Sequence, residues 1–270
     1  MKNLISNLFL CHLILFPIGL FAQRTIDLID SLHLEPYSFA FHPDGHALIA
    51  EYSRDNDMEY LVFLIQRENE IIIDTLPVED VNQATFSKGG DFILYNFFDR
   101  ISWESFTVKR AFNSPENIGP PTYVSPQLGL DNMSYYFMDE DESIYFFTYA
   151  ENDPSMTGLF YSAFENGRYQ QIQQIFANRD NVVAYSPLLL QKDLMLFPQH
   201  GIINEEPNGM YYAIKQENKW SEPIKLDGLP FCHNMAYYDE NTVAFLADQD
   251  SKFHLIPKSD IMNMINQKNK

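Results

Sequence analysis

The sequence is poor in cysteine and in positive charge. Its 270 residues include two cysteines, and 18 Lys and Arg stand against 37 Asp and Glu, giving a formal charge of −19. This charge argues against a nucleic-acid partner, because phosphate contacts need clustered Lys and Arg, and it also argues against docking on anionic lipid. If Cys11 is removed with the leader described below, Cys232 has no partner for an internal disulfide, so packing must stabilise the fold.

Long apolar runs are scarce as well. The one notable run, Leu8–Phe21, follows a short start with a single cation, Lys2, and it precedes Ala22. It contains Pro17 and is shorter than the roughly 20 residues of a membrane-spanning helix. This pattern predicts a signal peptide over residues 1–22, with an N-terminal membrane anchor as the alternative. We therefore expect export to the periplasm, the cell surface or the medium, and no transmembrane segment in the mature chain.

Apolar and aromatic side chains are abundant, at 46% and 15% of residues, which excludes a disordered chain. They recur in five copies of one pattern, an aromatic-containing strand, a polar turn and an apolar strand. The corresponding aromatic residues are Phe41, Phe86, Phe137, Tyr185 and Tyr237, spaced by 45, 51, 48 and 52 residues.

Further strands follow each hairpin, so that each repeat of about 50 residues would form four antiparallel strands. This predicts an all-β fold, a five-bladed β-propeller over residues 24–258, with a β-sandwich or two small β domains as alternatives. The fifth repeat ends after its third strand, near Pro257. Because Thr25–Leu32 resembles the fourth strand of the first repeat, we expect this N-terminal strand to pair with Lys252–Pro257 and close the ring.

Two segments are less regular than the rest. The proline-rich stretch after Arg110 predicts a short or irregular fourth strand in the second blade, because proline removes a ladder donor. Residues 259–270 form a short tail after the propeller, and Ser259 could cap a short helix there.

The repeats resemble a known family in two places. HPDG-x-ALIAEY from His42 and GMYYAIKQENKWSEPIKL from Gly209 resemble the TolB-type, WD-like propeller repeats of exported bacterial proteins. Lys88-Gly89-Gly90 departs from that pattern, as does His42 where the family has Ser. The resemblance implies an exported, non-catalytic propeller, and it supplies no catalytic residue.

The loops that join second to third strands should gather at the face of the ring where the innermost strands begin. They are rich in carboxylates and aromatic rings, which suits a carbohydrate, a protein partner or, as the one possible cofactor, calcium. With the entrance to the fifth blade, they supply these candidate ligand-binding residues: Tyr52, Asp57, Asp99, Trp103, Asp153, His200, Glu205, His233 and Asp248.

We therefore expect binding without catalysis through these acidic, aromatic loops, and no resident metal. A solvated acidic rim, a structural envelope module and a glycan-cleaving enzyme are the alternatives. The last would need carboxylates converging at the channel mouth. Those near the starts of the inner strands are Glu35, Asp80, Asp131 and Asp180. Cys232 and His233 are adjacent in a strand and point to opposite faces, which argues against a Cys–His nucleophile.

Overall fold

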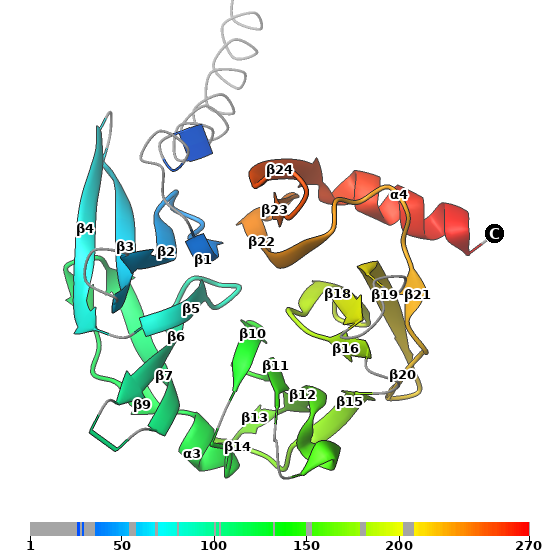
Figure 1. Ribbon diagram of the computed structural model, residues 1–270, viewed down its shortest axis with the longest axis horizontal. Helices are drawn as coiled ribbons and strands as arrows, with labels where there is room; N and C mark the ends of the chain where they lie inside the picture. The colour runs from blue at the N-terminus through cyan, green and yellow to red at the C-terminus, as the bar shows by residue number, and fades with distance from the viewer. Residues whose placement is uncertain are drawn as a thin grey trace, which may run out of the picture.

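Five antiparallel sheets surround a central axis as the blades of a propeller (Figure 1). The computed structural model describes residues 26–27, 29, 36–53, 58–67, 70–79, 81–99, 101–102, 104–131, 133–149, 153–178, 182–201 and 208–269. The predicted fold class, an all-β five-bladed propeller, is confirmed.

Each blade is one continuous stretch of the chain. Blade 1 contains β1 (Pro36–Phe41), β2 (Ala47–Ser53), β3 (Met58–Arg67) and β4 (Glu70–Glu79). Blade 2 contains β5 (Val81–Phe86), β6 (Phe92–Asp99), β7 (Glu104–Ser114), β8 (Asn117–Ile118) and β9 (Thr122–Tyr123). Blade 3 contains β10 (Ser134–Met138), β11 (Ile144–Thr148), β12 (Gly158–Ser162) and β15 (Gln173–Ala177), with the small hairpin β13 (Phe164–Glu165) and β14 (Arg168–Tyr169).

Blade 4 contains β16 (Val182–Ala184), β17 (Leu188–Gln191), β18 (Leu194–Gly201), β19 (Gly209–Gln216), β20 (Lys219–Trp220) and β21 (Ile224–Lys225). Blade 5 contains β22 (Cys232–Asp239), β23 (Thr242–Ala247) and β24 (Lys252–Pro257). The short helical elements are α3 (Ser125–Leu128) and η1 (Pro154–Met156). In blade 2 the outer position is shared by the two-residue strands β8 and β9, as the prolines there led us to expect.

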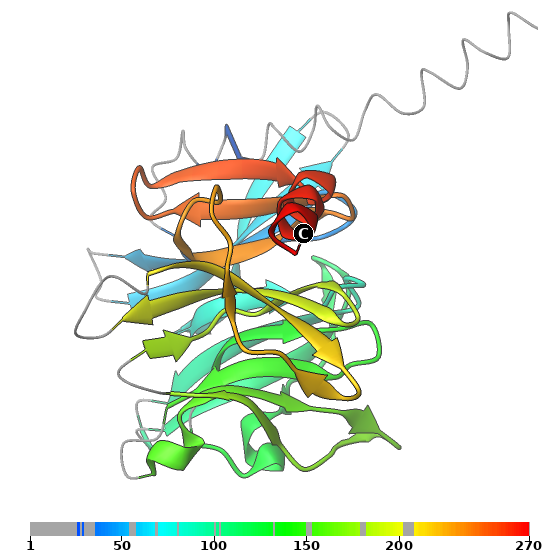
Figure 2. The same cartoon turned by 90° about the vertical axis from the view of Figure 1, so that its right-hand side faces the viewer.

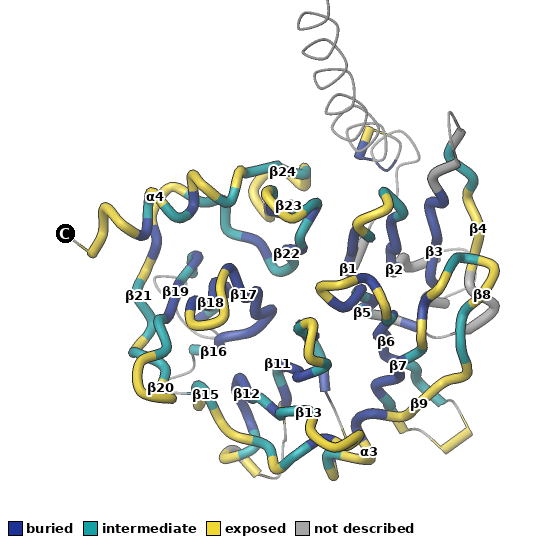
Figure 3. Tube along the Cα trace, turned by 180° about the vertical axis from the view of Figure 1, so that it is seen from behind, coloured by how far each residue is buried: buried dark blue, intermediate teal, exposed yellow. Residues whose placement is uncertain are grey.

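The second strand of each blade is buried because it lies between two neighbouring sheets. In β18, Leu194 to Pro198 are all buried, although successive side chains point to opposite faces. Figure 3 shows the same distribution around the ring, with buried inner strands and exposed outer segments such as β8 and β20. Runs of consecutive apolar residues in these strands are therefore a direct consequence of stacking sheet against sheet.

Four hydrophobic clusters fill the spaces between blades. One joins blades 1 and 2, one joins blades 2 and 3, and a large one runs through blades 3, 4 and 5. The fourth joins blade 5 to blade 1, where the Phe39 and Phe253 ring centroids lie 4.7 Å apart and those of Phe41 and Tyr238 lie 5.0 Å apart. The ring is therefore closed by side-chain packing.

The predicted closing strand Thr25–Leu32 is wrong for the residues of that segment that the structure describes. Ile26, Asp27 and Ile29 are helical, and the sheet of blade 5 consists of β22, β23 and β24. Ile26 and Ile29 are three residues apart, so a helix places both on one face, and both are buried in the cluster between blades 5 and 1. The segment contributes apolar side chains to the junction in place of a strand.

Helix α4 (Lys258–Lys268) follows β24 directly and lies on the outside of the ring (Figure 2). Ile261 and Ile265, one helical turn apart, are buried in the large cluster. Asn269 accepts a hydrogen bond from the Tyr212 hydroxyl at 2.7 Å, so the C-terminal segment is fixed to blade 4.

Blades 1 and 2 meet closely at their hairpin turns. Gly90 has φ of +84°, and a Cβ atom there would lie 2.3 Å from Nε2 of His42. His42, which departs from the family repeat, therefore packs against the turn glycine of the next blade, where the missing side chain of Gly90 makes room for the imidazole.

Gly90→Ala should destabilise the protein by about 3 kcal/mol, since a left-handed backbone strain of about 1 kcal/mol is joined by overpacking against His42. Gly167→Ala is the matched control, because Gly167 also has positive φ but a Cβ there would meet nothing within 4 Å. Urea unfolding of both variants measures the difference. Equal free energies of unfolding would contradict the proposed contact.

Candidate functional site

The innermost strands deviate from regular pairing at one shared position. In each blade a polar or phenolic side chain lines the central channel three residues before a fixed reference position. The reference positions are Phe41, Phe86, Met138, Leu189 and Tyr237. Register shifts occur beside this position in blades 1, 2, 3 and 5, and in blade 4 it separates β16 from β17. We call these five residues the channel ring: Ser38, Gln83, Tyr135, Ser186 and Asn234.

Three members of the channel ring have a left-handed backbone. Gln83, Tyr135 and Ser186 have φ of 52°, 47° and 45°. This conformation costs a residue other than glycine roughly 1–2 kcal/mol. Such strain persists where the surrounding structure enforces it, and bulges next to active sites often serve to re-aim a side chain. Its repetition in three blades therefore directs attention to the channel.

The ring side chains also connect neighbouring blades. Ser38 Oγ accepts a hydrogen bond from Ala84 N at 2.7 Å, and Gln83 Oε1 accepts one from Tyr135 N at 2.9 Å. These bonds fix the blades relative to one another at the axis.

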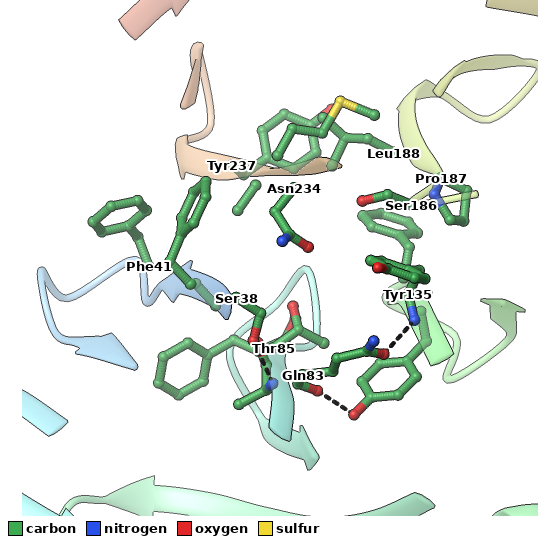
Figure 4. Close-up of a pocket in the computed structure, with 18 of the residues that line it drawn as sticks. Ser38, Phe41, Gln83, Thr85, Tyr135, Ser186, Pro187, Leu188, Asn234 and Tyr237 are labelled. Carbon is green, nitrogen blue, oxygen red and sulfur yellow. Dashed lines mark hydrogen bonds between the residues drawn. The ribbon is translucent and has the colours of Figure 1, made fainter. Parts of the chain in front are cut away.

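The channel contains a cavity of about 60 Å³ (Figure 4). The polar ends of Thr85, Ser186 and Asn234 are directed towards its centre. The charged side chain among the residues that line it is Lys88, which lies in a hairpin turn at the far end and pairs with Asp139 and Glu140, each at 3.2 Å. The polar groups that line the channel are therefore mainly hydroxyls and amides, and apolar side chains make up about half of the lining.

At the end where the inner strands begin, three side chains form a hydrogen-bonded chain. Tyr185 Oη lies 2.5 Å from His233 Nδ1, and His233 Nε2 lies 2.9 Å from a carboxylate oxygen of Asp248. Tyr185 connects β16 to β17, His233 lies in β22, and Asp248 follows β23. Tyr185 is buried, whereas the His233 side chain is 45% exposed at the channel mouth.

The protonation of this chain follows from its surroundings. Burial lowers the pKa of His233, an effect that His200 increases and Asp248 opposes. Burial also raises the pKa of Tyr185 far above its usual value, as do Tyr135 and Asp248. The favoured state at neutral pH is therefore a neutral imidazole. It donates a hydrogen bond from Nε2 to Asp248 and accepts one at Nδ1 from the Tyr185 hydroxyl.

Aromatic rings surround the chain. The Tyr185 ring stacks on His233 with centroids 5.5 Å apart, and Tyr135 packs against Tyr185 at 5.1 Å. Phe231 and His200 flank His233 at 5.3 and 5.9 Å. Nδ1 of His200 is buried without a hydrogen-bond partner among the described residues.

The predicted site residues separate into three groups. His200, His233 and Asp248 come together as described. Asp99 and Asp153 instead stabilise their own loops. Asp99 accepts a hydrogen bond from Ile101 N, and Asp153 accepts one from Ser155 N. Asp57, Trp103 and Glu205 lie outside the described residues, as does the side chain of Tyr52.

Sequence reasoning missed Tyr185 and the channel ring. It aligned Tyr185 with Phe41, but the structure places Leu189 at that position and Tyr185 four residues earlier. Tyr185 and His233 therefore occupy equivalent positions in blades 4 and 5, each directly before a ring residue. An alignment anchored on the hairpin turns would have revealed this equivalence.

The described part of the chain contains no group of three or more His, Cys, Asp or Glu side chains able to hold a metal ion. None of its helices is long and apolar enough to cross a membrane.

No protein-family model matches the sequence, and no curated protein does. Among solved structures, the tricorn protease matches with a TM-score of 0.51 and 13% identity, over 84% of this chain and 26% of its own. XC5397 from Xanthomonas campestris, described as a gluconolactonase, matches with a TM-score of 0.49 and 9% identity, over 82% and 75% of the two chains. TolB from Acinetobacter baumannii matches with a TM-score of 0.39 and 12% identity, over 70% and 45%. Identities this low show the fold alone.

These findings contradict the predicted function, a non-catalytic propeller that binds through acidic loops. The similar structures include the tricorn protease, and nothing in the comparisons supports binding by the loop face. Three of the four carboxylates named for the glycan-cleaving alternative, Glu35, Asp80 and Asp180, lie outside the described residues. A structural envelope module would need neither this bonded chain nor a strained ring.

The lowered pKa of His233 predicts a pH dependence of stability. In the unfolded chain this residue takes up a proton near pH 6.5, whereas in the folded protein it does so only at a lower pH. The free energy of unfolding should therefore fall as the pH drops below about 6.5. His42 and His46 act in the same direction, since burial lowers their pKa values as well. Urea unfolding at pH 7.5 and 5.5 should show a smaller loss for His233→Gln than for the wild type. An unchanged loss would mean that His233 titrates alike in both states.

Proposed function

We propose that this protein is an enzyme that hydrolyses small carboxylic esters, with Tyr185, His233 and Asp248 as its proton relay. The observation that carries the proposal is the pair of hydrogen bonds that join these residues, at 2.5 and 2.9 Å. A hydroxyl next to a base that a third group orients is the arrangement used for hydrolysis on several unrelated folds.

Each residue has a defined part in the reaction. Asp248 accepts the Nε2 proton of His233 and so holds the tautomer whose Nδ1 faces Tyr185. Water attacks the ester carbonyl carbon and gives a proton to Tyr185 Oη, while the phenolic proton passes to His233 Nδ1. The bond to the alcohol oxygen then breaks, and the proton returns through Tyr185 to that oxygen. Acid and alcohol leave, one water is consumed, and no cofactor is required.

Two further parts of the proposal rest on the sequence. The repeats are of the TolB type, which is supported by the placement of His42-Pro43-Asp44-Gly45 in the turn between β1 and β2 and of Trp220 in β20. The protein is exported, which is supported by the leader over residues 1–22. Its charge of −19 favours a small molecule over a nucleic acid as substrate.

The activity can be tested with 4-nitrophenyl acetate as the probe. Tyr185→Phe and Asp248→Asn should each lower kcat by roughly 100-fold or more, because they remove the proton acceptor and the group that orients the base. Asp153→Asn, which changes an exposed loop carboxylate, should leave kcat unchanged. The wild-type rate should also fall as the pH drops below about 6.5 towards the lowered pKa of His233, since a protonated imidazole cannot accept the relayed proton.

A purely structural role for the same residues gives a different result. The variants would then lose free energy of unfolding without a specific loss of kcat, and the pH profile would not follow His233. Folded wild-type protein that leaves the probe intact would refute the proposed activity.

Export can be tested separately. Expression in a bacterial host should yield a mature protein that begins at Gln23 or Arg24, as read by N-terminal sequencing of the extracytoplasmic fraction. A mature chain that retains residues 1–22 would contradict the signal peptide.

A further inference from the structure

We infer that the channel ring is the acyl-group site of this enzyme, and that the acyl group is short, uncharged and hydroxylated. The inference rests on the proposed function and adds the substrate class. The ring of Tyr135, which lines the channel cavity, packs against Tyr185 with centroids 5.1 Å apart, so the relay adjoins that cavity. An ester carbonyl at the relay would direct its acyl group into that cavity.

The ring selects against charge. Its members carry hydroxyl, phenol and amide groups, and Lys88 at the far end is already paired with Asp139 and Glu140. A carboxylate or ammonium group in the cavity would lose its hydration without gaining a counter-charge. The overall charge of −19 disfavours an anionic acyl group further.

The ring also favours a hydroxyl over a methyl group. Ser186 and Asn234 direct their polar ends into the cavity (Figure 4), and an apolar group there would separate them from water without replacing its hydrogen bonds. Sites built to bond a substrate hydroxyl discriminate strongly against the analogue that lacks it.

The volume limits the length of the acyl group. A cavity of about 60 Å³ has room for roughly four to six water-sized groups. An acyl group of two to four carbons fits this space, and a long alkyl chain does not. The left-handed backbone at three ring positions holds the polar groups of Gln83, Tyr135 and Ser186 in place around the cavity.

Four methyl esters of similar size test the substrate class, with methanol release followed by proton NMR. Methyl glycolate and methyl propionate differ by a hydroxyl in place of a methyl group, monomethyl malonate adds a negative charge, and glycine methyl ester adds a positive one. We expect kcat/KM for methyl glycolate to exceed that for methyl propionate by at least about tenfold, with both charged esters slower still. Methyl octanoate should react more slowly than methyl propionate.

The Asn234→Leu variant replaces a ring amide with an apolar side chain of the same number of heavy atoms, and it should bring the glycolate-to-propionate ratio close to one. Asn117→Leu, an exposed change in β8, is the matched control and should keep the wild-type ratio. Ser186→Ala serves as a second ring variant if Asn234→Leu does not fold, and it should also lower the ratio.

The outcomes separate the inference from the proposed function. Hydrolysis of all esters at similar rates, or a ratio that survives both ring variants, would overturn the acyl-group site and leave the relay standing. Failure of the wild type to hydrolyse any of these esters or 4-nitrophenyl acetate would overturn the proposed function, and the inference with it.

Discussion

The structure depends on the requirement that every sheet bury both of its faces. A single blade of about 50 residues cannot do this alone, so each blade covers its neighbours, and the succession ends when the fifth blade meets the first. The aromatic contacts of Phe39 and Phe41 with Phe253 and Tyr238 are the last of these interfaces, and they use the same kind of packing as the others. The inner strands are thereby forced together around one axis.

The candidate site is a product of that convergence. Residues that are about 50 positions apart in the sequence, such as Tyr185 and His233, become neighbours because they occupy the same position in adjacent blades. The distortion of the inner strands at the next position then directs polar groups into the channel. Since the blades themselves are built from apolar runs, a few polar positions on the inner strands can give the molecule its chemistry without disturbing its core.

The sequence revealed the architecture better than the site. Regular spacing, turn residues and apolar runs were sufficient to predict the blades. The prolines after Arg110 were sufficient to predict the irregular edge of blade 2. Thr25–Leu32 was misassigned because so short a segment fits two periods, with Ile26 and Leu28 alternating as in a strand and Ile26 and Ile29 spaced as in a helix. The channel ring was missed since its left-handed positions carry Gln, Tyr and Ser, and glycine is the residue that usually marks such a backbone.

The junction between blades 5 and 1 determines where the ring can open. Among the described residues the two blades share no strand, so the joint contains aromatic and aliphatic contacts and no ladder of backbone hydrogen bonds. A gap of about 0.5–1 Å already removes a quarter to a half of the dispersion energy of a contact, whereas the hydrogen bonds of a shared strand would have to break one after another. The ring can therefore open at this junction while every sheet stays intact. A force applied to the two ends of the propeller would act on this junction first.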